Sequence, residues 1–336
     1  MAKPIKEQIV VITGASSGIG REAALQFADK GASVVLAARN AEALEEVARQ
    51  VRERGGEALA VVTDVALWEQ VEALATAAVA RFGRIDTWVN NAGISEYATF
   101  EDLPVADMER IIQVNLLGTM YGVKAALPVL KRQGAGTIIN VGSGLGIRSI
   151  PLQGTYCTSK AGVKGFTEAL RMEMKHDHPD IRVTLILPAA INTPFYDNAR
   201  SRMGVRPKAM PPIYEAGTVA EAIVFAAANP RRDVYVGSPS KSLAVLESVA
   251  PDVTDRMMAR TLYKMQQKWD EPGDNAPDNM DAPVPGPGKV AGSYGDQSRS
   301  VSFYTKVFGL HPSRARLLGA LALGGALWAL SQRSRA

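Results

Sequence analysis

Near its N-terminus the chain reads Ile9-Val-Val-Ile-Thr-Gly-Ala-Ser-Ser-Gly-Ile-Gly20, an apolar run that ends in a glycine-rich stretch. The run is short enough to be a buried strand, and residues 21–30 after the glycines have helical character. A strand, a glycine turn and a helix N-terminus form a phosphate-binding site, because glycines let the backbone approach a pyrophosphate and free N–H groups bind its charge. An ordinary glycine-rich turn is the alternative, because the spacing is Gly-x3-Gly-x-Gly and not Gly-x-Gly-x-x-Gly.

Strands and helices alternate along the rest of the body. The expected strands are 33–37, 58–63, 87–89, 137–141, 182–187 and 233–236, and the expected helices are 41–54, 67–82, 106–131 and 218–228. This order predicts an α/β fold with a doubly wound, parallel, Rossmann-like sheet in three αβα layers, followed by a C-terminal extension. Ligands of such sheets bind beyond the carboxyl ends of the strands, where Asp64, Asn91 and Ser143 lie. Each of the three could singly be a turn or helix-capping residue.

The second strand ends at Ala38-Arg39. In such sheets an acid at this place binds the ribose hydroxyls of NAD, whereas an arginine pairs with the additional phosphate of NADP. The chain has no acid here, so the sequence favours NADP(H) over NAD(H). An ordinary solvated charge is the other interpretation of Arg39.

Further along, Tyr156-Cys-Thr-Ser-Lys160 places a phenol and an ammonium four residues apart at the expected start of a helix, so both lie on one face. Their free pKa values, about 10 and about 10.4, are too high for either group alone to carry protons at neutral pH. A nearby positive charge lowers the pKa of a phenol, and the pair can then act as a general acid or base. The same spacing also occurs by chance on many helices.

Five motifs, in the order of the chain, resemble the short-chain dehydrogenase/reductase family over roughly residues 5–240. They are Thr13-Gly-Ala-Ser-Ser-Gly-Ile-Gly20, Asn90-Asn-Ala-Gly93, Asn115, Ser143 and Tyr156-x-x-x-Lys160. The resemblance implies that Tyr156 is the catalytic acid or base, and that Lys160 lowers its pKa and holds the nicotinamide ribose. It also implies that Ser143 binds the substrate oxygen and that Asn115 positions Lys160 and a water in a proton relay.

The same resemblance implies a set of cofactor contacts around the strand ends. The set is Gly14, Ser16, Ser17, Gly18, Ile19, Gly20, Arg39, Asp64, Val65, Asn91, Ala92, Gly93, Tyr156, Lys160, Pro188, Ile191 and Thr193. Within it, Asp64 would meet the adenine, Asn91 and Gly93 the ribose side, and Thr193 the carboxamide region of the nicotinamide. One position departs from the family, because Ala189 follows Pro188 where glycine is usual, and alanine restricts the backbone.

The stretch 195–217 covers the substrate in members of this family and is the expected lid. It mixes apolar with basic residues, and the basic ones would either contact an anionic group or be solvated. The apolar residues favour a hydrophobic substrate, and the candidates for contact with it are Leu145, Leu152, Gln153, Phe195, Tyr196 and Tyr97. The expected activity is NADP(H)-dependent interconversion of a carbonyl and an alcohol. An NADP(H)-binding sensor or scaffold, and an enzyme of this fold that moves no hydride, are the alternatives.

Composition divides the chain into four parts. Residues 1–240 form the expected catalytic domain, 241–269 a helical extension, 270–300 a flexible linker rich in Pro and Gly, and 301–336 a basic and apolar tail. In the tail, the uncharged segment 317–330 would be about 21 Å long as a helix, short of the roughly 30 Å of bilayer hydrocarbon. Its leucines point all around the helix and arginines flank it, so attachment to a membrane and packing on protein both stay open.

The remaining composition narrows the class of protein. The single cysteine of the 336 residues, Cys157, excludes an internal disulfide and suits the cytoplasm, and the three histidines form no metal-ligand pattern. The N-terminus lacks the apolar run of a signal peptide. Although the net charge is +4, residues 1–305 hold 33 basic against 34 acidic side chains, which argues against a nucleic-acid-binding body. The family resemblance further implies a homodimer or homotetramer that acts on a small molecule.

Overall fold

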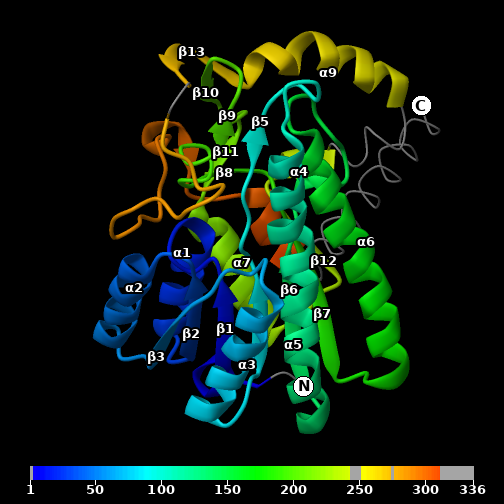
Figure 1. The fold of residues 1–336 in the computed structure, drawn as a ribbon. Coiled ribbons are helices and arrows are strands. Elements are labelled where there is room, and N and C mark those ends of the chain that lie inside the picture. Colours follow the sequence, from blue (N-terminus) through cyan, green and yellow to red (C-terminus); the bar gives the residue numbers. More distant parts are fainter. Residues whose placement is uncertain (1–2, 243–250, 274–275, 311–336) are drawn as a thin grey trace, which may run out of the picture.

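The computed structural model describes residues 3–242, 251–273 and 276–310, and Figure 1 shows their arrangement. A seven-stranded parallel sheet has the strand order β12-β7-β6-β4-β1-β2-β3. Its strands are β1 (Ile9–Thr13), β2 (Ser33–Ala38), β3 (Ala58–Val62), β4 (Thr87–Asn90), β6 (Gly136–Val141), β7 (Ile181–Pro188) and β12 (Asp233–Val236). Each coincides with an expected strand, so the predicted doubly wound parallel sheet is confirmed.

Helices cover both faces of the sheet (Figure 1). On one face lie α1 (Gly18–Ala28), α2 (Ala41–Glu53) and α7 (Ala216–Ala228), and on the other α3 (Trp68–Phe82), α5 (Gly118–Gln133) and α6 (Gly154–Asp177). The residues of β1 explain the layering, because successive strand side chains point to opposite faces. Val10 and Ile12 are buried in the core of the first face, and Val11 is buried in the core of the second. The predicted three-layer αβα architecture is therefore confirmed.

The expected helix 106–131 is divided in the structure. It consists of α4 (Val105–Ile112), a π-helical turn η2 (Gln113–Leu117) and α5. The π-turn contains Asn115, one of the residues predicted for the site. Such turns interrupt regular helices and frequently occur at functional sites.

Short strands and α9 (Pro251–Met265) stand above the carboxyl ends of the sheet (Figure 1). The strands are β5 (Glu96–Tyr97), β8 (Ala190–Asn192), β9 (Arg200–Ser201), β10 (Val205–Pro207), β11 (Ile213–Glu215), β13 (Gln267–Pro272) and β14 (Ser298–Arg299). The remaining short turns are η1 (Ile5–Glu7), η3 (Gly144–Gly146), η4 (Gly295–Gln297) and η5 (Thr305–Leu310). Because β11 pairs with both β8 and β14, and β10 pairs with β13, the C-terminal extension forms part of the roof over the sheet.

The C-terminal extension departs from the prediction of a flexible linker over 270–300. Met280 is fully buried, and the guanidinium groups of Arg21 and Arg39 donate hydrogen bonds to backbone carbonyls of this segment. The backbone carbonyl oxygens of a segment rich in Pro and Gly need hydrogen-bond donors, because the segment forms little secondary structure. Here the side chains of Arg21 and Arg39 supply donors to some of them. The apolar segment 317–330 lies outside the described residues. Among the helices that are described, none has both the length and the apolarity to cross a bilayer.

Candidate active site

A cavity of about 960 Å³ lies at the carboxyl ends of the sheet strands. The glycine loop and the ends of β2 and β3 form one end of it, and the lid and α9 form the other. Most predicted cofactor residues line it: Gly14, Ser16, Ser17, Gly18, Ile19, Arg39, Asp64, Val65, Asn91, Ala92, Gly93, Tyr156, Lys160, Pro188, Ile191 and Thr193. Gly20 is the exception, because it lies beneath the loop and supports its conformation.

The glycine loop depends on backbone geometry that only glycine allows. Gly14 has a φ of +67°, and a Cβ placed on Gly20 would lie 2.2 Å from the carbonyl oxygen of Gly14. The end of β4 holds the loop in place. Asn91 Nδ2 donates to the carbonyl oxygens of Thr13 at 3.0 Å and Gly14 at 3.3 Å, while Thr13 Oγ1 accepts the backbone N–H of Asn91 at 3.0 Å. Thr13 and Asn91 therefore shape the glycine loop together.

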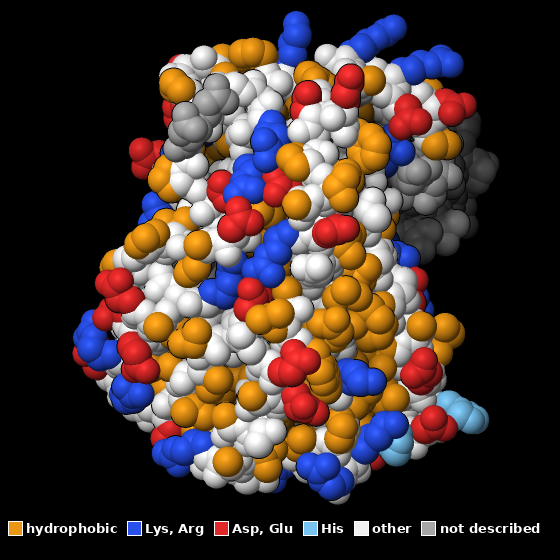
Figure 2. Space-filling view, viewed as in Figure 1, with side chains coloured by type: hydrophobic (Ala, Val, Ile, Leu, Met, Phe, Trp, Pro, Cys, Tyr) orange, Lys and Arg blue, Asp and Glu red, His pale blue; other side chains and the backbone are white. Residues whose placement is uncertain are grey.

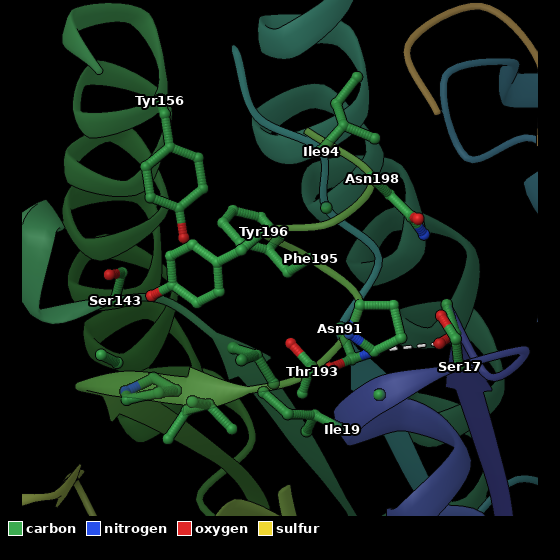
Figure 3. A pocket seen from close by; sticks show the side chains of 18 of the residues that line it. Ser17, Ile19, Asn91, Ile94, Ser143, Tyr156, Thr193, Phe195, Tyr196 and Asn198 are labelled. Carbon is green, nitrogen blue, oxygen red and sulfur yellow. Dashed lines mark hydrogen bonds between the residues drawn. The ribbon is translucent and has the colours of Figure 1, made fainter. Parts of the chain in front are cut away.

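Tyr156 extends from the first turn of α6 toward Ser143, which follows β6 (Figure 3). Ser143 Oγ accepts the backbone N–H of Leu145 at 3.1 Å, which fixes its side chain. Burial raises the pKa of the Tyr156 hydroxyl above its ordinary value, and the hydrogen bond with Ser143 acts in the opposite direction. Two hydroxyl groups thus meet at one point on the cavity wall.

Lys160 lies one helical turn after Tyr156 and is buried beside it. Its Nζ donates to the carbonyl oxygen of Val141 at 3.0 Å and lies 5.8 Å from the centroid of the Tyr156 ring. Burial lowers the pKa of Lys160 to about 8. The fold therefore places an ammonium of reduced proton affinity next to a phenol, an arrangement suited to proton transfer.

Asn115 is fully buried in the π-turn and does not reach the cavity wall. Its Oδ1 accepts the N–H of Ile94 at 2.9 Å, and its Nδ2 donates to the carbonyl oxygen of Ile94 at 3.0 Å and to Ser159 Oγ at 3.1 Å. Ser159 in turn donates to the carbonyl oxygen of Tyr156 at 2.7 Å. Asn115 therefore fixes the stretch of α6 that carries both Tyr156 and Lys160, and its part in positioning Lys160 and a water stays a prediction.

Aromatic side chains form the wall next to Tyr156. Ring centroids lie 5.5 Å apart both between Tyr156 and Phe195 and between Phe195 and Tyr196 (Figure 3). Leu145 and Gln153 line the same cavity, as does Tyr97. This end of the cavity is therefore apolar around a small group of hydroxyls.

Leu152 is not among the described residues that line the cavity, although the sequence predicts a substrate contact for it. Its φ of +67° turns the backbone, its side chain is buried, and its carbonyl oxygen accepts the N–H of Ala98 at 3.0 Å. Within the described chain it is the only non-glycine residue with positive φ.

Ala189 stands where glycine is usual in the family. Because its φ is not positive, the alanine side chain causes no backbone strain of the left-handed kind.

The α9 helix also contributes to the cavity, which the sequence does not predict. Met257, Met258, Leu262 and Met265 line it, together with Met210 from the lid. The spacing of Met258, Leu262 and Met265 matches one helical face and predicts a helix that packs on something. The surface on which α9 packs depends on the tertiary fold, and the spacing of residues along the helix does not reveal it.

Both charged residues predicted at the adenosine end have protein partners. The Asp64 carboxylate pairs with Arg110 at 2.5 Å. The Arg39 guanidinium donates to backbone carbonyls of the C-terminal extension at Met280 and Asp281, at 3.3 and 3.1 Å. Neither set of partners is predicted from the sequence.

Comparison with known proteins identifies the family. The model of the short chain dehydrogenase family matches residues 8–204. An uncharacterized oxidoreductase of Bacillus subtilis, YxnA, is 40% identical over 338 residues, which cover 99% of this chain and 93% of the relative. A putative oxidoreductase of Mycobacterium tuberculosis, SadH, is 33% identical over 264 residues, 76% of this chain and 96% of the relative.

Solved structures agree with the sequence relatives. A short-chain dehydrogenase/reductase of Burkholderia phymatum in complex with NAD has a TM-score of 0.68 at 28% identity, covering 75% of this chain and 96% of that one. An alcohol dehydrogenase of Thermococcus sibiricus complexed with 5-hydroxy-NADP has a TM-score of 0.60 at 30% identity, covering 68% and 95%. The chain belongs to the short-chain dehydrogenase/reductase family of oxidoreductases. Its fold is one that binds a nicotinamide cofactor.

Proposed function

We propose that the protein is an NADP(H)-dependent oxidoreductase that interconverts a carbonyl and an alcohol on a hydrophobic substrate. The observation that carries the proposal is that Ser143, Tyr156 and Lys160 share one cavity wall with the glycine loop. The cavity, about 960 Å³, can hold a dinucleotide along the loop and a substrate next to Tyr156. When bound, the nicotinamide supplies or accepts the hydride.

Tyr156, Ser143 and Lys160 are proposed to carry out the proton transfer and to bind the substrate oxygen. In the reducing direction the Tyr156 hydroxyl gives its proton to the substrate oxygen, and in the oxidising direction the phenolate takes it back. Ser143 donates a hydrogen bond to the same oxygen and orients it. The Lys160 ammonium, 5.8 Å from the centroid of the Tyr156 ring, is proposed to favour the phenolate. Asn115 is a positioning residue, because it acts through Ser159 and α6.

The cofactor contacts follow from the same geometry. The loop residues that line the cavity are proposed to bind the pyrophosphate, Asp64 the adenine and Thr193 the carboxamide region. Arg39 at the end of β2, where no acid stands, supports NADP(H) over NAD(H). The apolar wall of Phe195, Tyr196 and the methionines of α9 supports a hydrophobic carbonyl or alcohol as substrate.

The proposal is tested by titrating the full-length protein with NADPH and NADH, and then following oxidation of the preferred cofactor with aldehydes, ketones and quinones. Tight binding of NADPH with turnover of an apolar carbonyl supports it. Binding without turnover on a broad panel would favour a sensor or scaffold, and absence of binding would contradict the interpretation of the glycine loop. The homodimer or homotetramer, the cytoplasmic location and membrane contact through 317–330 stay predictions from the sequence.

A further inference from the structure

Residues 278–292 of the C-terminal extension, which we call the strap, lie across the adenosine end of the cavity. The strap follows β13 and passes beside α1 and α2, where it is the orange loop of Figure 1. Asn279, Val284 and Lys289 of the strap line the cavity, and Lys289 lies against the glycine loop. The strap therefore forms part of the wall of the proposed cofactor site.

Donors of the catalytic body bind the carbonyl oxygens of the strap. The pairs are Gly18 N–H with Lys289 (3.0 Å), Arg21 Nη1 with Pro287 (2.7 Å) and Asn40 Nδ2 with Val284 (2.9 Å). The approach is close, because a Cβ on Gly288, whose φ is +65°, would lie 2.4 Å from the carbonyl oxygen of Ser16. The strap thus fits the surface of the glycine loop by its backbone shape.

Arg39 is engaged by three consecutive strap carbonyls. Its Nη1 donates to Met280 and Asp281, and its Nη2 donates to Asn279. Three of the four N–H groups on the terminal nitrogens, which would pair with phosphate oxygens, are therefore already engaged. The Met280 side chain between these carbonyls is fully buried in the core that also contains Val65, which holds this part of the strap down.

Ion pairs hold the start of the strap next to Arg39. Arg200 binds Asp278 at 2.9 Å and Asp281 at 2.6 Å, and it also binds Asp107 of α4 at 2.7 Å. Figure 2 shows basic and acidic side chains gathered between the strap and α4. Asp281 is largely exposed, so this attachment can be exchanged for contacts with solvent or a ligand. The carboxylates also oppose a phosphate at this place.

We propose that the strap is a specificity element of the cofactor site that competes with the 2′-phosphate of NADP(H) for Arg39. NADP(H) pairs with Arg39 only when the carbonyls of residues 279–281 release it, whereas NAD(H) lacks this phosphate and does not require that release. The contacts of residues 279–281 with Arg39 therefore lower the affinity for NADP(H) and hardly affect NAD(H), whereas the bond between Gly18 and Lys289 concerns the pyrophosphate that both cofactors share. The inference rests on the proposed role of Arg39 in NADP(H) binding.

The test measures dissociation constants of NADPH and NADH for the full-length wild type, Met280→Ala, Arg39→Ala and the double variant. Met280→Ala removes the buried side chain that holds the strap against Arg39. We expect it to tighten NADPH binding by at least about fivefold and to change NADH binding by less than about twofold. Met172→Ala, which truncates an exposed methionine of α6, is the matched control and should change neither constant.

Hydrogen exchange of the wild type gives a readout that needs no variant. NADPH should raise amide exchange at residues 279–281 because they leave Arg39, and NADH should not. Protection of these amides by NADPH, or equal weakening of both cofactors in Met280→Ala, would show that the strap clamps the bound cofactor and would overturn the proposal. An unchanged NADPH constant in Met280→Ala would overturn it as well.

Arg39→Ala separates a failure of this inference from a failure of the proposed cofactor preference. If Arg39→Ala weakens NADPH in both backgrounds while Met280→Ala gives no gain, Arg39 binds the phosphate and the strap does not compete. If Arg39→Ala changes nothing even in the Met280→Ala background, the proposed preference for NADP(H) is wrong and the inference fails with it.

Discussion

Lys160 Nζ donates a hydrogen bond to the backbone carbonyl of Val141 at 3.0 Å. Val141 ends β6, and Ser143 follows it two residues later, while Lys160 lies on α6 one turn after Tyr156. One buried ammonium therefore connects the strand end that carries the candidate oxygen-binding serine to the helix that carries the candidate acid. The same hydrogen bond holds the Lys160 ammonium next to the ring of Tyr156.

This burial makes the stability of the fold depend on pH. The folded protein holds Lys160 with a pKa of about 8, below the ordinary 10.5 that applies to the unfolded chain. Between these values the unfolded state binds more protons, so the free energy of unfolding rises with pH. We expect a rise of about 2 kcal/mol from about pH 7.5 to about pH 9.5 by chemical denaturation. Lys160→Met should lack this part of the rise, and an unaltered pH profile in that variant would contradict the assignment.

Two helical glycines give a matched pair of substitutions. Gly20→Ala places a methyl group 2.2 Å from the carbonyl oxygen of Gly14, so the loop must shift and dinucleotide binding should fall by at least about tenfold. Gly165→Ala on α6 meets nothing within 4 Å and should raise the free energy of unfolding by about 0.5–1 kcal/mol. Titration with NADPH and thermal unfolding measure both effects. Equal cofactor affinity in the two variants would argue against a phosphate-binding role of the loop.

The sheet, its layers and the glycine loop could be predicted because the signals are local. Alternating apolar strands and helices, and the strand before Gly14, are visible within short windows. The strap could not be predicted, because its Pro- and Gly-rich composition is that of a linker and its partners Arg21 and Arg39 lie far away in sequence. Only the folded body reveals that these donors face the carbonyls of the strap.

Among the individual site residues, too, some positions could be predicted from the sequence and others could not. The spacing of Tyr156 and Lys160 follows from helical geometry, and both line the cavity. Leu152 does not line the cavity and has a positive φ that no residue pattern predicts, so its contact with a substrate stays a prediction. The position of Asn115 beneath α6 requires a π-turn inside an expected continuous helix, and this too is invisible at the level of apolar spacing.

The α9 helix should influence which substrates are accepted. Met257 lines the cavity although it is half exposed, so Met257→Ala should hardly affect folding. Loss of its apolar surface should raise KM for long or bulky apolar carbonyls by about three- to tenfold, while short ones keep theirs. Val253→Ala removes an exposed side chain of the same helix that does not line the cavity and serves as control. A similar change in both variants would place the effect in the stability of α9 and not in substrate contact.

The most direct measurement compares Tyr156→Phe with the wild type in NADPH oxidation on an apolar carbonyl, together with the dissociation constant of NADPH. The substitution removes one hydroxyl and keeps the ring that packs on Phe195. The account predicts a fall in kcat of about 10²–10⁴ with an NADPH dissociation constant within about twofold of the wild type. Tyr263→Phe, at a half-exposed position on α9 away from the cavity wall, should behave as the wild type. Full turnover by Tyr156→Phe would contradict the central claim that this hydroxyl transfers the proton.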